Sequence, residues 1–261
     1  MKYYSTRDKA HARPCSLREA VEAGASVIDV GGYSSRSGAD EVSPEEEWRR
    51  VDLGVGAVRS LSSDLPVSID TFRSSVAARA IHKYGKVIIN DISAGELDPL
   101  IVDVAAEHDV PYVAMHMKGD PKTMQSLTDY KRDITAEVVA YFEARVAALL
   151  AAGIAREHLV LDPGFGFAKT TEQNYELLAG LHRLCALGYP VLAGLSRKSM
   201  IYRVLGVTPA QSLAGTVALG WECLRQGAAI LRVHDVREAV DTVRIFNAYV
   251  QNSGEICQMK K

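Results

Sequence analysis

Leu159-Val-Leu-Asp162-Pro-Gly-Phe-Gly-Phe167 is the stretch of sequence on which the fold assignment depends. Three apolar residues predict a short buried strand, and Pro163 and Gly164 force the chain to turn directly after Asp162. A carboxylate at the end of a buried strand is costly unless it is paired. One isolated aspartate would most simply cap a turn. The same arrangement recurs along most of the chain, however, and indicates an organised set of polar strand ends.

Short apolar runs alternate with helical stretches of ten or more residues, which is the βα repeat of a parallel sheet. The seven runs lie at residues 26–30, 66–69, 87–91, 112–116, 159–162, 190–194 and 230–234. A polar group stands at the end of every run, whereas an open sheet concentrates its site at one switch point. This pattern favours a TIM (β/α)8 barrel. Because a barrel needs eight strands, the first strand is missing from the pattern.

Composition and length limit the domain organisation and the function. The 261 residues contain no low-complexity linker, so we expect one barrel domain at 16–250, an irregular segment at 1–15 and a polar tail at 251–261. A net charge of −2 gives no field for nucleic acid or a membrane surface. No apolar stretch is long enough to span a membrane, and no signal peptide is recognisable. Four cysteines without metal or redox spacing fit a reducing compartment, so we expect a cytoplasmic protein.

On a barrel, the carboxyl-terminal ends of the strands converge on one mouth. The polar groups there place carboxylates, an amide and a histidine on one arc and cations on the other: Asp29, Asp70, Asn90, His116 between Met115 and Met117, Asp162, Lys198, Arg232 and His234. The cations belong to the last strands, where TIM barrels often bind phosphate. We therefore expect a diphosphate-like anion near the cations and an amino-substituted heterocycle near the carboxylates.

Several other signals have simpler explanations. Asp91 and Asp235 are expected to pair with nearby backbone or arginine. The acidic run at 45–47 follows Ser43-Pro and is interpreted as a helix start, because the helix dipole favours acids in the first turn. Ser196 and Ser199 have no recognisable pair of base and orienting group, so we do not expect a serine nucleophile. The remaining histidines show no metal-ligand spacing.

Seven motifs, in order and with consistent gaps, resemble the dihydropteroate synthase family from about residue 16 to residue 250. They are Ile28-Asp-Val-Gly-Gly-Tyr-Ser-Ser-Arg36, Ser68-Ile-Asp-Thr71, Ile89-Asn-Asp-Ile92, Met115-His-Met-Lys-Gly-Asp-Pro-Lys-Thr-Met-Gln125, Leu161-Asp-Pro-Gly-Phe-Gly-Phe167, Ser196-Arg-Lys-Ser-Met200 and Arg232-Val-His-Asp235. The last two distinguish this family from other pterin-binding barrels, such as methyltetrahydrofolate methyltransferases.

The resemblance implies a homodimeric transferase of folate biosynthesis. It would condense (7,8-dihydropterin-6-yl)methyl diphosphate with 4-aminobenzoate, giving 7,8-dihydropteroate and diphosphate, with Mg2+ assisting. The substrate-binding residues it implies are, for the pterin, Asp70, Asn90, Met115, Asp162, Lys198 and Arg232; for the diphosphate, Arg36, Arg232 and His234; and for the aminobenzoate, Ser35, Arg36, Ser196 and Lys198. Lys198, Arg232 and His234 would be catalytic through their charge, and no residue is assigned to a metal.

Three features depart from the family pattern. Ser37 replaces a proline and Ala168 replaces a glycine, which alters the backbone freedom of two loops. Nothing in residues 1–15 resembles the family's first strand, whose asparagine ligates the diphosphate-bound Mg2+. We therefore expect impaired turnover, with pterin binding retained better than catalysis. The alternatives are a non-catalytic pterin-binding or partner protein derived from this family, and a truncated copy or misassigned start codon.

Overall fold

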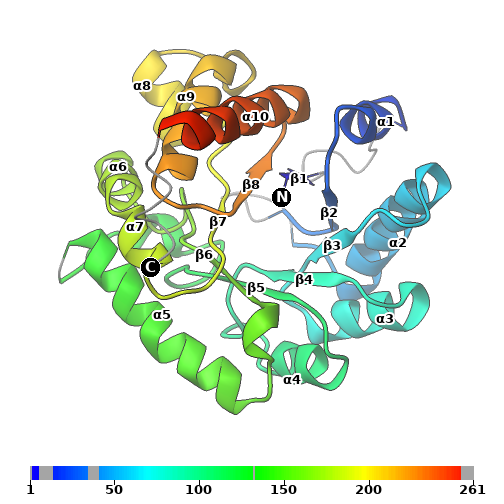
Figure 1. The fold of residues 1–261 in the computed structure, drawn as a ribbon. Helices are drawn as coiled ribbons and strands as arrows, with labels where there is room; N and C mark the ends of the chain where they lie inside the picture. The colour runs from blue at the N-terminus through cyan, green and yellow to red at the C-terminus, as the bar shows by residue number, and fades with distance from the viewer. Residues whose placement is uncertain (1, 6–13, 35–40, 132, 254–261) are drawn as a thin grey trace.

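A computed structural model describes residues 2–5, 14–34, 41–131 and 133–253 of the chain (Figure 1). Within these ranges, eight parallel strands form one sheet in the order β6-β5-β4-β3-β2-β1-β8-β7. The strands are β1 Lys2–Ser5, β2 Val27–Gly31, β3 Val67–Asp70, β4 Ile88–Asp91, β5 Tyr112–Met115, β6 Leu159–Asp162, β7 Leu192–Ala193 and β8 Ile230–Val233. Helices surround this sheet on its outer side, so the chain is an α/β protein of the expected class.

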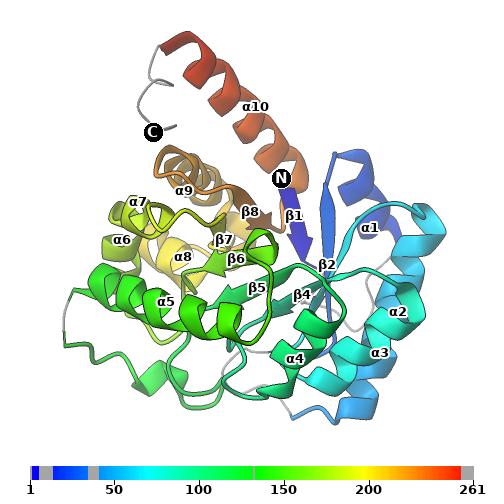
Figure 2. The ribbon, with the colours of Figure 1, turned by 60° about the horizontal axis from the view of Figure 1, so that its bottom comes forward.

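The helices follow the strands in sequence. The α-helices are α1 Pro14–Glu22, α2 Pro44–Leu61, α3 Ser74–Tyr84, α4 Leu100–Glu107, α5 Ile134–Ala151, α6 Thr171–Ala179, α7 Leu181–Cys185, α8 Ser199–Leu205, α9 Leu213–Arg225 and α10 Val236–Ser253, and the short 3-10 turns are η1 Met124–Ser126, η2 Arg156–His158 and η3 Pro209–Gln211. No helix in the described part of the chain is long and apolar enough to cross a membrane. Helix α10 contacts α9 and covers β1 and β8 (Figure 2).

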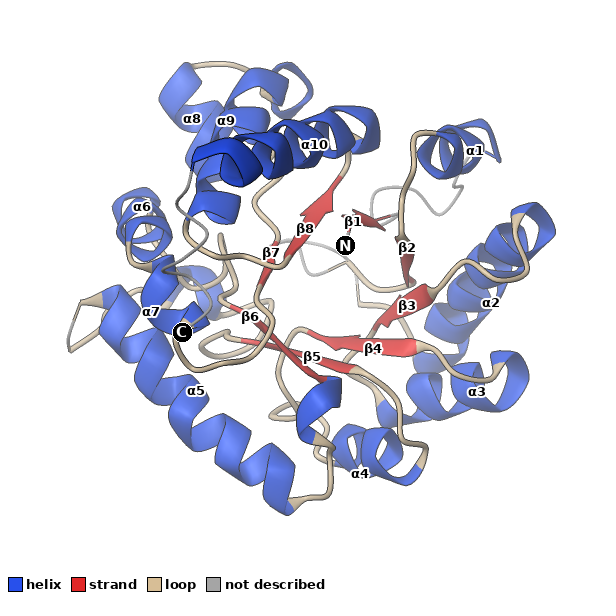
Figure 3. Ribbon diagram, in the orientation of Figure 1, coloured by secondary structure: helices blue, strands red, loops and turns tan. Residues whose placement is uncertain are grey.

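The two ends of the sheet meet, so the strands form a barrel. Leu161 of β6 makes a parallel bridge with Val191, the residue before β7. The Leu161 N–H also donates a hydrogen bond to the carbonyl of Pro190 at 2.9 Å. Figure 3 shows the strands arranged as a ring inside the helices. The predicted TIM-barrel architecture is therefore present.

The count of seven strands was wrong, because Lys2–Ser5 forms the first strand of the barrel. This strand pairs with β2 on one side and with β8 on the other, so that Tyr3 is in register with both Val27 and Arg232. The segment expected to be irregular thus contains a strand and the start of α1. Lys-Tyr-Tyr-Ser contains no aliphatic residue, and four residues are too few to show a strand period.

The register places the site above an apolar layer. Inside the barrel, the buried residues Val27, Val113, Leu192 and Ile230 form one cluster. The next inward positions along the strands are polar or lie beside polar residues, since side chains alternate between the two faces of a strand. Parallel pairing also puts Asp70 level with Asn90 and Met115 level with Asp162. The strand ends therefore present their side chains at one end of the barrel.

Candidate active site

One side of the barrel mouth is a network of buried side chains from four strands. Arg232 of β8 donates through Nε and Nη2 to Asp29 Oδ2, at 2.8 and 2.6 Å, and through Nη2 to Asp70 Oδ2 at 3.0 Å. Asn90 Nδ2 lies 3.3 Å from both carboxylate oxygens of Asp29. Both aspartates and Asn90 are buried. The structure thus brings together Asp70, Asn90 and Arg232 with Asp29, which contacts both Asn90 and Arg232.

Asp162 ends β6 and is held by the turn that follows it. Its Oδ1 accepts a hydrogen bond from the Gly164 N–H at 2.8 Å. Burial raises the pKa of the Asp162 carboxyl, and the positive charges of Lys198 and Arg232 act in the opposite direction. Gly164 has φ +67°, and a Cβ there would lie 2.0 Å from the carbonyl oxygen of His116. Only glycine therefore fits this turn.

Lys169, which sequence reasoning missed, is buried beneath the loop after β6. Its ammonium nitrogen lies 3.0 Å from His116 Nδ1 and donates to the carbonyls of Gly164 and Phe167, each also at 3.0 Å. Burial lowers the pKa of Lys169 to about 7. Burial also lowers the pKa of His116 well below its usual value, so the imidazole is neutral and Nδ1 can accept a hydrogen bond.

Lys198 lies on the other side of the same loop. Its ammonium donates to the carbonyl oxygen of Phe165 and lies over the ring of Phe167, 4.8 Å from the ring centroid. A Cβ on Gly166 would approach Lys198 Cδ to 3.2 Å, so the loop backbone packs closely on the lysine stem. The position of this predicted catalytic cation therefore depends on the loop between β6 and α6.

The remaining predicted residues also lie at strand ends. Met115 is buried against Phe167 and other apolar residues. The Ser196 hydroxyl accepts a hydrogen bond from the His234 N–H at 3.2 Å and lies 3.1 Å from its Nδ1. Sequence reasoning did not foresee this contact with His234, which supplies one half of a base-and-orienter pair and leaves the expectation about a serine nucleophile as a prediction. The chain fold brings the pair together from β7 and β8, 38 positions apart.

Two predicted residues, Ser35 and Arg36, lie outside the described residues, as does Ser37. Ala168 is described and has φ +50°, a left-handed conformation in which glycine is more favourable. Its carbonyl accepts a hydrogen bond from the Tyr130 hydroxyl at 2.8 Å. The alanine that departs from the family pattern thus occupies a position where glycine would be unstrained.

The expectation that Asp91 and Asp235 have structural partners is confirmed. Asp91 accepts hydrogen bonds from the Tyr112 hydroxyl at 2.6 Å and from the Gly95 N–H at 2.6 Å. Asp235 accepts from Arg197 Nε at 3.0 Å. Asp91 and Asp162 are both buried carboxylates at strand ends. They differ in that Asp91 accepts from the side chain of Tyr112 as well as from backbone, whereas Asp162 Oδ1 accepts from the Gly164 N–H.

A second buried acid was also missed. The interpretation of residues 45–47 as a helix start holds, since Ser43 caps α2 by accepting the Glu46 N–H at 3.2 Å. Glu47, however, is fully buried and accepts from Thr71 Oγ1 and Arg73 Nη1, each at 2.6 Å. This ion pair attaches α2 to the loop after β3. Among the described residues, no group of three or more His, Cys, Asp or Glu side chains is placed to hold a metal ion.

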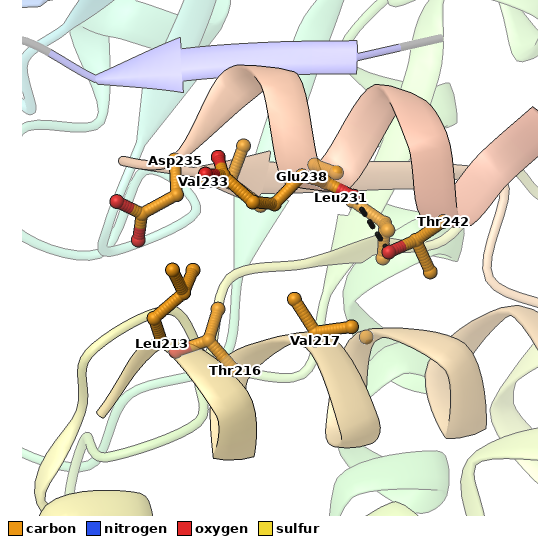
Figure 4. A pocket seen from close by; sticks show the side chains of 10 residues that line it. Leu213, Thr216, Val217, Leu231, Val233, Asp235, Glu238 and Thr242 are labelled. Atoms are coloured by element: carbon orange, nitrogen blue, oxygen red, sulfur yellow. Dashed lines mark hydrogen bonds between the residues drawn. The ribbon is translucent and has the colours of Figure 1, made fainter. Parts of the chain in front are cut away.

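A small, mainly apolar pocket lies between α9, α10 and β8 (Figure 4). Its lining residues are Leu213, Thr216, Val217, Gly220, Leu231, Val233, Asp235, Glu238, Ala239 and Thr242. The Thr242 hydroxyl donates within its own helix to the Glu238 carbonyl at 2.7 Å, and Thr216 Oγ1 accepts from the Arg197 N–H. These polar groups are satisfied by the protein, and none of the predicted site residues lines the pocket. We interpret it as a gap in packing.

Comparison with known sequences identifies the class first. The pattern of the family described as pterin binding enzyme matches residues 8–234. The chain therefore belongs to the pterin binding enzymes. Membership of this family accounts for the (β/α)8 barrel and its polar mouth. Curated relatives within this family include dihydropteroate synthases, so the resemblance seen in the seven motifs is confirmed.

Two curated relatives illustrate the similarity. The chain is 46% identical over 228 residues to dihydropteroate synthase of Escherichia coli strain K12, covering 87% of this chain and 79% of the relative. It is 41% identical over 249 residues to dihydropteroate synthase of Synechocystis, covering 94% and 85%. The match thus extends over most of both proteins.

Solved structures agree with this assignment. Yersinia pestis dihydropteroate synthase in a sulfonamide drug complex matches with a TM-score of 0.88 and 37% identity, covering 96% of this chain and 94% of that chain. The Thermus thermophilus enzyme in complex with 4-aminobenzoate matches with a TM-score of 0.85 and 40% identity, covering 95% and 93%. The Anaplasma phagocytophilum enzyme with bound 6-hydroxymethylpterin-monophosphate matches with 0.87 and 31%, covering 95% and 98%.

Proposed function

We propose that this chain condenses (7,8-dihydropterin-6-yl)methyl diphosphate with 4-aminobenzoate to form 7,8-dihydropteroate and diphosphate. The observation that carries the proposal is the convergence of Asp70, Asn90, Met115 and Asp162 at the mouth of a pterin-binding barrel. Relatives solved with 4-aminobenzoate and with a pterin phosphate support the two substrates. The reaction belongs to folate biosynthesis and is a transfer of an alkyl group other than methyl.

The buried carboxylates suit the pterin. A pterin presents an amino group and ring N–H groups along one edge, and Asp162 is a buried acceptor at the end of β6. Asp70 and Asn90 supply further polar atoms from the neighbouring side of the mouth. Met115, level with Asp162, offers an apolar surface for the ring. Charge-assisted hydrogen bonds of this kind are shorter and stronger than neutral ones.

The chemistry that we propose is electrostatic. The bond between the pterin methylene and the diphosphate oxygen breaks, and its electron pair leaves on the diphosphate. The lone pair of the aminobenzoate nitrogen then forms the new C–N bond, and that nitrogen loses a proton to water. Lys198, Arg232 and His234 stabilise the negative charge that develops on the leaving group. Arg36 is part of the proposed diphosphate site, and Ser35 and Ser196 of the aminobenzoate site.

Mg2+ enters the proposal only together with the diphosphate. The described residues include no cluster of potential metal ligands, and Asp29 and Asp70 are both bonded to Arg232. Mg2+ commonly binds through substrate phosphates and only one or two carboxylates. When bound, it would add positive charge at the leaving group, which the protein cations also supply.

We also propose a cytoplasmic homodimer. The exposed apolar side chains of Ile245 and Tyr249 on α10 support an association surface, since one is 63% and the other 47% exposed. Analytical ultracentrifugation at micromolar protein concentration tests this: a single sedimenting species of twice the chain mass is expected. A monomer at all concentrations would contradict the dimer.

Two measurements test the proposed function: the affinity for a pterin and the rate of turnover. Isothermal titration with a hydroxymethylpterin is expected to give saturable heat, and none at high ligand concentration would refute pterin binding. A turnover assay with both substrates, with and without Mg2+, is expected to give product that depends on Mg2+. Strand β1 is present, but its sequence Lys-Tyr-Tyr-Ser has no asparagine, so we expect slow turnover alongside normal pterin affinity. Binding without any turnover would favour the non-catalytic alternative.

A further inference from the structure

We propose that Lys169 is a positioning residue that fixes the loop after β6 and, through this loop, the positions of Asp162 and Lys198. The inference rests on the proposed function, because it assigns Lys169 to the pterin side of that same site. Lys169 is buried, and its ammonium contacts His116 and the carbonyls of Gly164 and Phe167 in that loop.

The partners of Lys169 are unusual for a buried cation. An ammonium group has three N–H donors, and here they meet two backbone carbonyls and the neutral His116 imidazole. None of these three partners is a carboxylate. Burying an ammonium without a counter-charge in contact is costly, so the stability of the fold alone does not favour a lysine here. We therefore infer that the lysine serves the geometry of the loop.

Lys169 reaches Asp162 through a single residue. The carbonyl of Gly164 accepts from Lys169 at 3.0 Å, while the N–H of the same glycine donates to Asp162 Oδ1 at 2.8 Å. Gly164 also packs on the end of β5, where a Cβ would meet the His116 carbonyl at 2.0 Å. Gly164 thus contacts Lys169, Asp162 and the end of β5. If the bond to Lys169 is lost, Gly164 and the Asp162 carboxylate bonded to it can shift.

Lys169 reaches Lys198 through the other end of the loop. It binds the carbonyl of Phe167, whose ring lies under the Lys198 ammonium at 4.8 Å from the centroid. Between the two anchored residues lies Phe165, whose carbonyl accepts from Lys198. Both ends of the 164–167 segment are therefore attached to one ammonium group, and Lys198 rests on that segment.

The test is the Lys169→Met variant of the full chain. The apolar side chain has similar length and removes the buried charge, so the variant is expected to fold. We expect at least a tenfold fall in kcat/KM for the pterin diphosphate and a matching loss of hydroxymethylpterin affinity by titration. A misplacement of about 1 Å in groups that orient a substrate can cost about 100-fold in rate, so a tenfold loss corresponds to a smaller shift. Circular dichroism and thermal unfolding establish that equal amounts of folded protein are compared.

Chemical rescue separates positioning from a purely structural role. In Lys169→Ala, ethylammonium is expected to enter the vacated space and to raise kcat/KM in proportion to its concentration. The matched control is Lys118→Met, because Lys118 is an exposed cation near the same mouth that donates to the Asp129 carbonyl. That control is expected to change kcat/KM less than twofold. Tyr130→Phe is a second variant, which removes one other bond to the loop and is expected to have a smaller effect.

The possible outcomes distinguish the two proposals. A wild-type chain that binds no pterin refutes the proposed function and the role of Lys169 with it. A wild type that turns over, with Lys169→Met equally active per folded molecule, refutes only the role of Lys169. If Lys169→Met does not fold, the inference is tested by amine rescue of Lys169→Ala and by the effect of Tyr130→Phe. The inference is overturned if the amine does not rescue Lys169→Ala and Tyr130→Phe has no effect.

Discussion

The two sides of the barrel mouth are built in different ways. On the side of β2, β3, β4 and β8, the polar side chains bind one another, with Arg232 joined to Asp29 and Asp70. On the side of β5, β6 and β7, the charged groups of Asp162, Lys169 and Lys198 bind the backbone of a loop. Strand register fixes the positions of the side chains on the first side. On the second side, the positions of the charged groups depend on the conformation of the loop that they bind.

The two sides also differ in charge. Two carboxylates face one guanidinium on the first side, and two ammonium groups accompany one carboxylate on the second. The first side therefore has an excess of negative charge, and the second side has an excess of positive charge when Lys169 is protonated. A low-dielectric wall strengthens such interactions, so this difference in charge acts on the orientation of a charged substrate in the mouth.

The largest effect is expected from breaking the first side with Arg232→Met. Asp29 and Asp70 would remain buried without their cation, and loss of one partner of a buried pair costs about 3–5 kcal/mol. The free energy of unfolding, measured in urea, is expected to fall by about this amount, and turnover should be lost. Arg197→Met is the control, since its pair with Asp235 is more exposed, with 35% of the arginine side chain accessible. Equal losses for the two variants would contradict the comparison.

A smaller effect is expected from Asp162→Asn. The amide replaces one acceptor oxygen by a donor, so the proposed bonds to the pterin are lost at about 1.5–3 kcal/mol, which is roughly 10- to 100-fold in kcat/KM. Asp91→Asn is the matched control, because Asp91 is also buried and accepts its hydrogen bonds from Tyr112 and Gly95, which are not site residues. It is expected to lower stability and to leave kcat/KM per folded molecule within about twofold. A kinetic loss in Asp91→Asn as large as in Asp162→Asn would refute the distinction.

The first side could be predicted from the sequence, because its residues end strands. Asp70 and Asn90 each follow a short apolar run, and any parallel barrel brings such positions together. Strand β1 could not be predicted, since Lys-Tyr-Tyr-Ser is recognisable as a strand only once β2 and β8 lie on either side of it. Its pairing is set by residues far along the chain.

The burial of Lys169 and Glu47 could not be predicted either. Both residue types are usually exposed, and nothing adjacent in the sequence marks these two as exceptions. Their side-chain partners lie far along the chain, since His116 is 53 positions from Lys169 and Arg73 is 26 positions from Glu47. The nearby partners of Lys169 are backbone carbonyls, which carry no sequence signal. A pattern search of neighbouring residues therefore finds strand ends but not the buried groups that support their loops.

The smallest effect is a pH dependence confined to the second side. The pKa of Lys169 is about 7 in the folded chain and 10.5 ordinarily, so between these values the unfolded chain holds a proton that the folded chain has released. Stability therefore rises with pH in this window, by on the order of 1 kcal/mol from pH 7 to pH 8. Lys169→Met lacks this group, whereas His116, Asp162 and Lys198 are present in both proteins. Urea unfolding of both proteins at the two pH values should show the rise only in the wild type. Parallel changes would mean that the folded chain retains the Lys169 proton, and the loop would then rest on a permanent charge.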